Sequence, residues 1–209
     1  MAVEVKIEGG FAEVGAGEWL VSHGQPAAFL GSFRRLRRKG WFVKDRAVLD
    51  CVRTGGRSCF SIADAPFLTH IPCAEKISAV SSKVLVAPVA ARVSAEVFKP
   101  IPMSVGGSFA TTTFEREWLV VATRSRTARL VVEDGQTLSV RPDAVVAWTG
   151  NRPTGFCARL GLVDLLLPVA PRELALNFHG PCIVWIEGAN PRAAQLPGHL
   201  AFRRNAYGA

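Results

Sequence analysis

Histidine and cysteine are the side chains of this sequence that could act as base, nucleophile or metal ligand. The four histidines, His23, His70, His179 and His199, are widely spaced, and none has a carboxylate at a spacing typical of a catalytic pair. His70 and Cys73 stand at H-x-x-C spacing, but a zinc site needs three or four ligands and nothing nearby in the sequence completes the set. We therefore expect no metal and no cofactor.

The local motifs of common enzyme classes are also missing from the sequence. There is no G-x-S-x-G elbow, and Gly15-Ala16-Gly17 lacks the further glycine, lysine and helix of a phosphate-binding loop. The five cysteines are odd in number and form no C-x-x-C pair, so we expect buried free thiols. The sequence predicts a protein that is not an enzyme, and a site assembled from distant residues remains the third alternative.

One dense run of charge is the strongest candidate for a binding site. Five cations in six positions repel one another unless they are solvated or face phosphate, anionic lipid or an acidic protein. Aromatic neighbours could stack on bases or anchor in a bilayer interface, whereas a solvated loop with spare charge is the alternative. The predicted binding residues are Arg34, Arg35, Arg37, Arg38, Lys39 and Trp41. The formal net charge of +8 points to the same classes of partner.

The composition is that of a globular chain. Of the 209 residues, 49% are hydrophobic and 20% are charged, which is enough apolar material for a substantial core. No apolar stretch reaches the length of about 18 residues that a spanning helix needs, so we expect no transmembrane segment. The first twenty residues hold four glutamates against one lysine, unlike a signal or transit peptide.

Alternation with a period of two predicts β-strands along most of the chain. Val3, Val5 and Ile7 alternate with charged residues, as in a half-buried strand. Trp19, Trp118, Trp148 and Trp185 lie in such patterns and are predicted core residues. Further strands are predicted at 18–22, 47–52, 58–62, 83–87, 92–98, 108–114, 118–123, 128–133, 137–140, 144–148, 155–160, 171–178 and 182–187. Because Asp-Gly suits a type I′ turn, Asp134-Gly135 predicts a hairpin between 129–133 and 136–140.

Several strand segments resemble one another. The run 119–123 is similar to 84–88, the run 183–186 gives a third version, and 135–142 is similar to 17–24. Such units cannot each bury an apolar face alone, so we expect them to pack together. The predicted fold is an all-β sandwich or barrel of repeated antiparallel strand units. It forms a single domain over 1–209 with about three repeats and a candidate seam near 98–107.

These segments carry a resemblance to a known family. The stretches 17–24, 84–88, 134–148 and 178–186 look like the repeats of the altered-inheritance-of-mitochondria protein 24 family. The resemblance implies a β-rich fold like that of the tryptophan RNA-binding attenuator protein, a homotrimer, and no established enzymatic activity. The sequence departs from the family at Gly180-Pro181-Cys182, where the family has Gly-Pro-Gly, and at the turn Glu115-Arg116-Glu117.

The resemblance also implies a cellular setting. We expect a scaffold or accessory subunit of a large mitochondrial complex, of the respiratory chain or the organisation of the inner membrane, located in the matrix or peripheral to the inner membrane. Its partners would be protein subunits, with anionic lipid or RNA at the basic run. The alternative is an RNA-binding module or a protein associated with the mitochondrial ribosome.

Overall fold

The computed structural model describes residues 5–22, 26–36, 49–98, 109–158 and 173–188, and these ranges fold almost entirely into β-strands. Two short 3₁₀ turns interrupt them, η1 (Ser81–Lys83) and η2 (Val89–Ala91). The all-β class is therefore confirmed. The strands are β1 (Lys6–Glu8), β2 (Phe11–Val14), β3 (Gly17–Val21), β4 (Ala28–Phe29), β5 (Phe33–Leu36), β6 (Asp50–Thr54), β7 (Ser58–Phe60), β8 (Phe67–Pro72), β9 (Ile77–Val80), β10 (Val84–Pro88), β11 (Arg92–Phe98), β12 (Phe109–Phe114), β13 (Trp118–Thr123), β14 (Thr127–Val132), β15 (Thr137–Val140), β16 (Val145–Thr149), β17 (Thr154–Ala158), β18 (Glu173–His179) and β19 (Cys182–Glu187).

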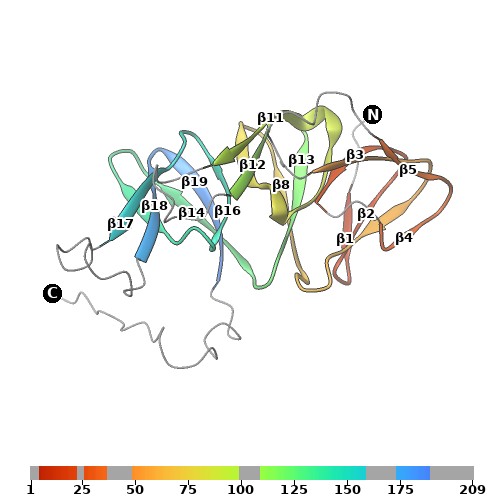
Figure 1. Ribbon diagram of the computed structural model, residues 1–209, viewed down its shortest axis with the longest axis horizontal. Helices are drawn as coiled ribbons and strands as arrows, with labels where there is room; N and C mark the ends of the chain where they lie inside the picture. Colours follow the sequence, from red (N-terminus) through yellow and green to blue (C-terminus); the bar gives the residue numbers. More distant parts are fainter. Residues whose placement is uncertain (1–4, 23–25, 37–48, 99–108, 159–172, 189–209) are drawn as a thin grey trace.

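The strands form four sheets that are stacked along the long axis of the molecule (Figure 1). Sheet I has the order β1-β2-β7-β4 and sheet II the order β5-β6-β3-β10-β13-β8. Sheet III has the order β11-β12-β9-β16-β19-β14 and sheet IV the order β15-β18-β17. Sheets II and III lie in the middle, with sheet I at one end and sheet IV at the other.

Apolar side chains fill the space between neighbouring sheets. The central core combines Leu20 and Leu119 of sheet II with Val146 and Trp185 of sheet III. A second core joins sheets I and II, and a third joins sheets III and IV. Strands β10, β13 and β16 of the central sheets are therefore covered on both faces, and all of their residues are buried.

Aromatic rings occupy the two outer cores. Between sheets I and II, Phe60 packs with Trp19 and Trp118, whose ring centroids are 5.8 Å apart. Between sheets III and IV, the ring of Trp148 meets the edge of Phe178 at a centroid distance of 5.8 Å. All five are buried, and Trp185 is also buried, so the prediction that Trp19, Trp118, Trp148 and Trp185 are core residues is confirmed.

Strand β13 shows why the central strands lack a simple alternating pattern. All six of its residues are buried. Trp118 and Val120 point into the core between sheets I and II, whereas Leu119 and Val121 point into the core between sheets II and III. Strand β13, with the sequence WLVVAT, therefore contributes side chains to two different cores.

A β-bulge recurs at the start of three strands. In β10 the register jumps past Leu85, in β16 past Val146 and in β11 past Val93. Strands β10 and β11 begin directly after η1 and η2, and β16 follows a turn in which the Ala144 amide donates to the Arg141 carbonyl at 3.1 Å. A bulge bends and twists a strand locally, which suits a chain that passes repeatedly between sheets II and III.

The predicted hairpin at Asp134-Gly135 is wrong. The turn is present, with the Gln136 amide donating to the Glu133 carbonyl at 3.1 Å and Gly135 at φ 75°. However, β14 pairs with β19 in sheet III, whereas β15 pairs with β18 in sheet IV. A type I′ turn needs positive φ at both central residues, and Asp134 does not have it, so the two strands splay apart.

The strand that carries the start of the basic run was not predicted. Phe33–Leu36 forms β5, an edge strand of sheet II, where a loop was one of the alternatives. Of the candidate seam, residues 99–107 lie outside the described part of the chain. The strands on either side of it, β11 and β12, pair with each other in sheet III.

Candidate functional site

The edge strand β5 positions the first two arginines of the basic run. Its neighbour is β6, with Arg34 opposite Arg53 and Arg35 opposite Val52. Phe33 packs toward the core between sheets I and II, and Leu36 packs toward the central core, so both ends of the strand are held. Arg34 and Arg35 are exposed. The other predicted binding residues, Arg37, Arg38, Lys39 and Trp41, lie outside the described residues.

Carboxylates accompany most arginines around this edge. The Arg35 guanidinium lies 2.5 Å from Asp50 Oδ1, and the Arg57 guanidinium lies 2.5 Å from Glu13 Oε1. Arg53 of β6 forms an ion pair with Glu18 of β3. Within the described ranges, Arg34 forms no ion pair. It also stands directly opposite Arg53, and like charges in such a pair repel, so this edge carries one positive charge that an anionic partner would stabilise.

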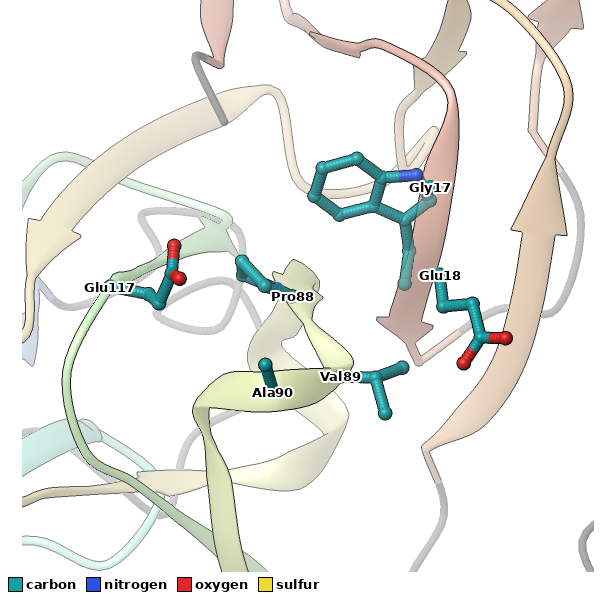
Figure 2. A pocket seen from close by; sticks show the side chains of 7 residues that line it. Gly17, Glu18, Pro88, Val89, Ala90 and Glu117 are labelled. Carbon is teal, nitrogen blue, oxygen red and sulfur yellow. The ribbon is translucent and has the colours of Figure 1, made fainter. Parts of the chain in front are cut away.

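A pocket of about 330 Å³ opens where β3, β10 and the turn before β13 meet (Figure 2). It is lined by Gly17, Glu18, Trp19, Pro88, Val89, Ala90 and Glu117. Figure 2 shows Glu18 and Glu117 on opposite sides of the turn that carries Val89 and Ala90, so their carboxylates do not converge. The Trp19 indole N–H is already used, because it donates to Thr54 Oγ1 at 3.0 Å. The pocket is mostly apolar, Glu18 and Glu117 are its acidic residues, and no serine, threonine, cysteine or lysine lines it.

The turn beside this pocket adopts an unusual backbone conformation. Arg116 and Glu117, which join β12 to β13, both have φ 63°, in the left-handed region that favours glycine. The Glu117 carbonyl accepts a hydrogen bond from the Cys73 amide at 3.0 Å, which helps to hold the turn. Two consecutive positive φ values are typical of a type I′ turn. The sequence departs from the glycine turn of the resembled family at this same place.

The two described histidines lie on strands of sheets IV and II. His179 of β18 bridges two hydroxyls across sheet IV, Thr137 Oγ1 at 3.0 Å and Thr154 Oγ1 at 3.3 Å. The ring of His70 lies 5.9 Å from that of Trp118, and partial burial lowers the pKa of His70.

Three of the four described cysteines are buried. Burial raises the pKa of Cys73 to about 11, so this thiol stays protonated at neutral pH. Burial also raises the pKa of Cys182. Cys51, Cys73 and Cys182 are buried and Cys59 is half-buried, and no two of these four form a disulfide with each other. In the ranges that the structure covers, no three histidine, cysteine or acidic side chains are placed to hold a metal ion.

A shielded ion pair, which the sequence does not indicate, lies where the chain crosses from sheet III to sheet II. Lys83, at the end of η1, donates to Glu187 Oε1 at 2.9 Å and to the carbonyls of Asp143 and Val145 at 2.7 and 2.8 Å. The Lys83 and Glu187 side chains are only 17% and 16% exposed. Burial lowers the pKa of Lys83, and the hydrogen bond to Glu187 opposes that shift. The sequence does not predict this contact, because a single lysine among apolar strands does not indicate which distant carboxylate it meets.

Comparison with known proteins bears on the fold. No family model matches the chain, and no curated protein matches it. A crystal structure of protein SPYM3_0169 from Streptococcus pyogenes is similar, with a TM-score of 0.68 and 12% sequence identity over 92% of this chain and 95% of that one. At this identity the likeness shows a shared fold over nearly the full length. Among the described residues, no helix has the length and apolar character to cross a membrane.

Proposed function

We propose that this chain is a non-catalytic scaffold that docks in a larger assembly, with the edge strand β5 facing an anionic partner. The observation that carries the proposal is the arginine pair on neighbouring strands, Arg34 opposite Arg53. Arg53 is neutralised by Glu18, whereas Arg34 has no ion-pair partner in the described chain. An acidic group on a partner would supply the missing countercharge.

The rest of the molecule supports a scaffold role. Four stacked sheets with three apolar cores give a body in which β5 is fixed at both ends by Phe33 and Leu36. A fixed strand presents its arginines with little conformational entropy to lose on binding. From the resemblance described above, we also propose that this scaffold is an accessory subunit of a mitochondrial assembly.

A nucleic-acid partner fits this edge less well. Sequence-independent RNA binding depends on lysine and arginine contacts to many phosphates. Here Arg35, Arg53 and Arg57 already face Asp50, Glu18 and Glu13, so phosphates would compete with these carboxylates.

The size of the native assembly tests the proposal. The full chain, carrying an affinity tag, is isolated from its own cells with a mild detergent and its mass is measured by native mass spectrometry. We expect a complex of fixed stoichiometry that Arg34→Glu dissociates and that nuclease treatment leaves intact. Arg129→Glu on β14, an exposed arginine of sheet III, is the matched control and should retain the complex. A chain that remains alone, or equal complexes for both variants, would contradict the proposal.

A further inference from the structure

The two central sheets repeat the same arrangement of strands. Sheet II has the order β5-β6-β3-β10-β13-β8, and adding six to each strand number gives β11-β12-β9-β16-β19-β14, which is the order of sheet III. In each sheet the two three-stranded halves join through one antiparallel pair, β3 with β10 in sheet II and β9 with β16 in sheet III. The chain therefore contains a structural repeat whose successive units share their sheets.

The two outer sheets each correspond to one half of this arrangement. The order β17-β18-β15 of sheet IV is that of the half β11-β12-β9, again with six added. In sheet I, β4-β7-β2 is the counterpart of the other half, β10-β13-β8, and β1 is added beside β2. Within the described ranges, no strand pairs with the second edge of β4 or with the second edge of β15. Sheet IV thus lacks the kind of half that sheet I has, and sheet I lacks the kind that sheet IV has.

The internal pairs define the register in which these two edges would meet. In sheet III, Ser78 lies opposite Trp148 of the neighbouring half. Ser139 is the counterpart of Ser78, because each serine forms a hydrogen bond with the residue opposite it on the next strand, Thr113 at 3.1 Å and Asn177 at 2.8 Å. Phe29 is the counterpart of Trp148, because each ring packs against an aromatic ring on the side of the next sheet in the stack. The repeat therefore places Phe29 opposite Ser139.

The backbone hydrogen bonds of β4 and β15 agree with this register. The Leu30 amide donates to the Arg57 carbonyl at 2.8 Å, and the Gly180 amide donates to the Gln136 carbonyl at 3.0 Å. Successive residues of an antiparallel strand direct their N–H and C=O groups to opposite sides. Those of Phe29, next to Leu30, and of Ser139, three residues after Gln136, therefore point to the two unpaired edges. Placed opposite each other, these two residues can exchange both N–H···O bonds.

An exposed leucine is fixed at the end of the β4 edge. Leu30 is 66% exposed, and in this register it lies opposite Leu138, which packs against the core between sheets III and IV. The Leu30 loop, residues 30–32, is held by the turn that connects β6 to β7, where the Gly55 amide donates to the Ser32 carbonyl at 2.7 Å. The two turns approach so closely that a Cβ atom at Gly56 would lie 2.3 Å from the Leu30 carbonyl oxygen. Pairing would cover this leucine with an apolar side chain.

We propose that copies of this chain associate head to tail, through antiparallel pairing of β4 of one copy with β15 of the next. The sheet so formed, β17-β18-β15 followed by β4-β7-β2, would have the strand order of sheets II and III. Neither strand carries a charged residue or a proline, with which proteins often prevent pairing at an edge. Sheets I and IV lie at opposite ends of the molecule (Figure 1), so the contact is heterologous. The inference goes beyond the proposed function, since β5 belongs to neither edge.

Disulfide trapping between two separate variants of the full chain, Phe29→Cys and Ser139→Cys, tests the register. Opposite residues of a hydrogen-bonded antiparallel pair have Cα atoms about 5.5 Å apart, which a disulfide can span. We expect the mixture to form a covalent dimer on mild oxidation, above the background that the native cysteines give in wild type and in either variant alone.

The matched control for trapping is Thr137→Cys mixed with Phe29→Cys. Thr137 is exposed like Ser139 and lies on the same strand, two residues away, so its Cα atom would be about 7–8 Å from that of Phe29. This spacing exceeds the reach of a disulfide, and the control mixture should give much less dimer. No dimer from Phe29→Cys with Ser139→Cys, or equal yields from the two mixtures, would overturn the inference.

Sedimentation equilibrium of the purified full chain tests the association itself. We expect a mass above that of a single chain, and Leu30→Asp should weaken the association at least about tenfold, because it places a charge opposite Leu138. Val131→Asp on β14, where the side chain is 60% exposed, is the control and should associate like the wild type. Equal far-UV circular dichroism spectra verify that both variants fold. A wild type that stays monomeric, or Leu30→Asp that associates like the wild type, would overturn the inference.

Discussion

Lys83 and Glu187 join two parts of the chain that are 104 residues apart, through a hydrogen bond of 2.9 Å between Nζ and Oε1. Lys83 leads from sheet III into sheet II, and Glu187 ends β19 of sheet III. Because the same ammonium also donates to the carbonyls of Asp143 and Val145, all three of its donors are used. These three hydrogen bonds hold the chain in place where it crosses from sheet III to sheet II.

Replacing Lys83 with methionine should destabilise the protein strongly. The variant keeps most of the apolar volume but leaves the Glu187 carboxylate and two carbonyls without their donor. We expect a loss of about 2–4 kcal/mol in the free energy of unfolding, measured by urea denaturation. Lys6→Met, which breaks an exposed pair with Glu8, is the control and should not shift the midpoint. Equal midpoints for Lys83→Met and wild type would show that the cluster contributes no stability.

Glycine at the turn before β13 should stabilise the protein. Arg116 has φ 63°, a conformation that costs a non-glycine residue about 1–2 kcal/mol. Arg116→Gly removes that cost, and part of the gain is lost to the greater freedom of glycine in the unfolded chain, so we expect a net gain of about 0.5–1 kcal/mol in the free energy of unfolding. Glu115→Gly, at the neighbouring exposed residue without positive φ, should be neutral or destabilising. A midpoint for Arg116→Gly below that of wild type would contradict the assignment of strain.

A methyl group at Gly56 should disturb the Leu30 loop. Because the added Cβ would lie 2.3 Å from the Leu30 carbonyl oxygen, the two turns must move apart. We expect Gly56→Ala to lower the free energy of unfolding by about 1–3 kcal/mol in thermal or urea denaturation. The control is Gly15→Ala, where the added atom meets nothing within 4 Å. Similar stabilities for the two variants would contradict the close approach of the Gly56 and Leu30 backbones.

Stability should fall between about pH 9 and 11 because of Cys73. Its pKa is about 11 in the folded protein, against 9.0 for an ordinary thiol, since burial disfavours the thiolate. Above the lower value the unfolded chain loses a proton that the folded chain keeps, so stability decreases as the pH rises through this window. Urea midpoints measured from pH 8.5 to 11 should decline less steeply for Cys73→Ala than for wild type. Parallel declines for the two proteins would show that Cys73 does not contribute.

The sequence predicts the strands far better than it predicts their partners. The bounds of β11, β13, β15 and β19 match the predicted ranges, because local alternation and buried apolar runs depend on nearby residues. The pairing of β14 and β15 was wrong because burial in different sheets outweighed the turn signal of Asp134-Gly135. Sheet membership depends on contacts between distant segments, which the local pattern does not contain.

The candidate site stays a prediction, and the sequence supplies only part of it. Charge density, which is a local property, makes Arg34 and Arg35 candidates. It did not indicate that Arg34 faces Arg53, or that Asp50 neutralises Arg35, since both relations depend on strand register. The exposure of Leu30 was likewise hidden, because an apolar residue between strands is usually assigned to a core. The contacts of Lys83 and the positive φ of Arg116 could not be predicted either, because both depend on the three-dimensional arrangement of the chain.

Photo-crosslinking from position 34 tests most directly whether β5 is the contact surface of this scaffold. A photoreactive amino acid is placed at Arg34 or, in a matched sample, at Arg129, and the full chain is irradiated in its own cells. We predict a discrete adduct with one protein or with phospholipid from position 34, resistant to nuclease, and none from position 129. Adducts of equal yield from both positions, an adduct that nuclease removes, or no adduct at position 34 would contradict the account.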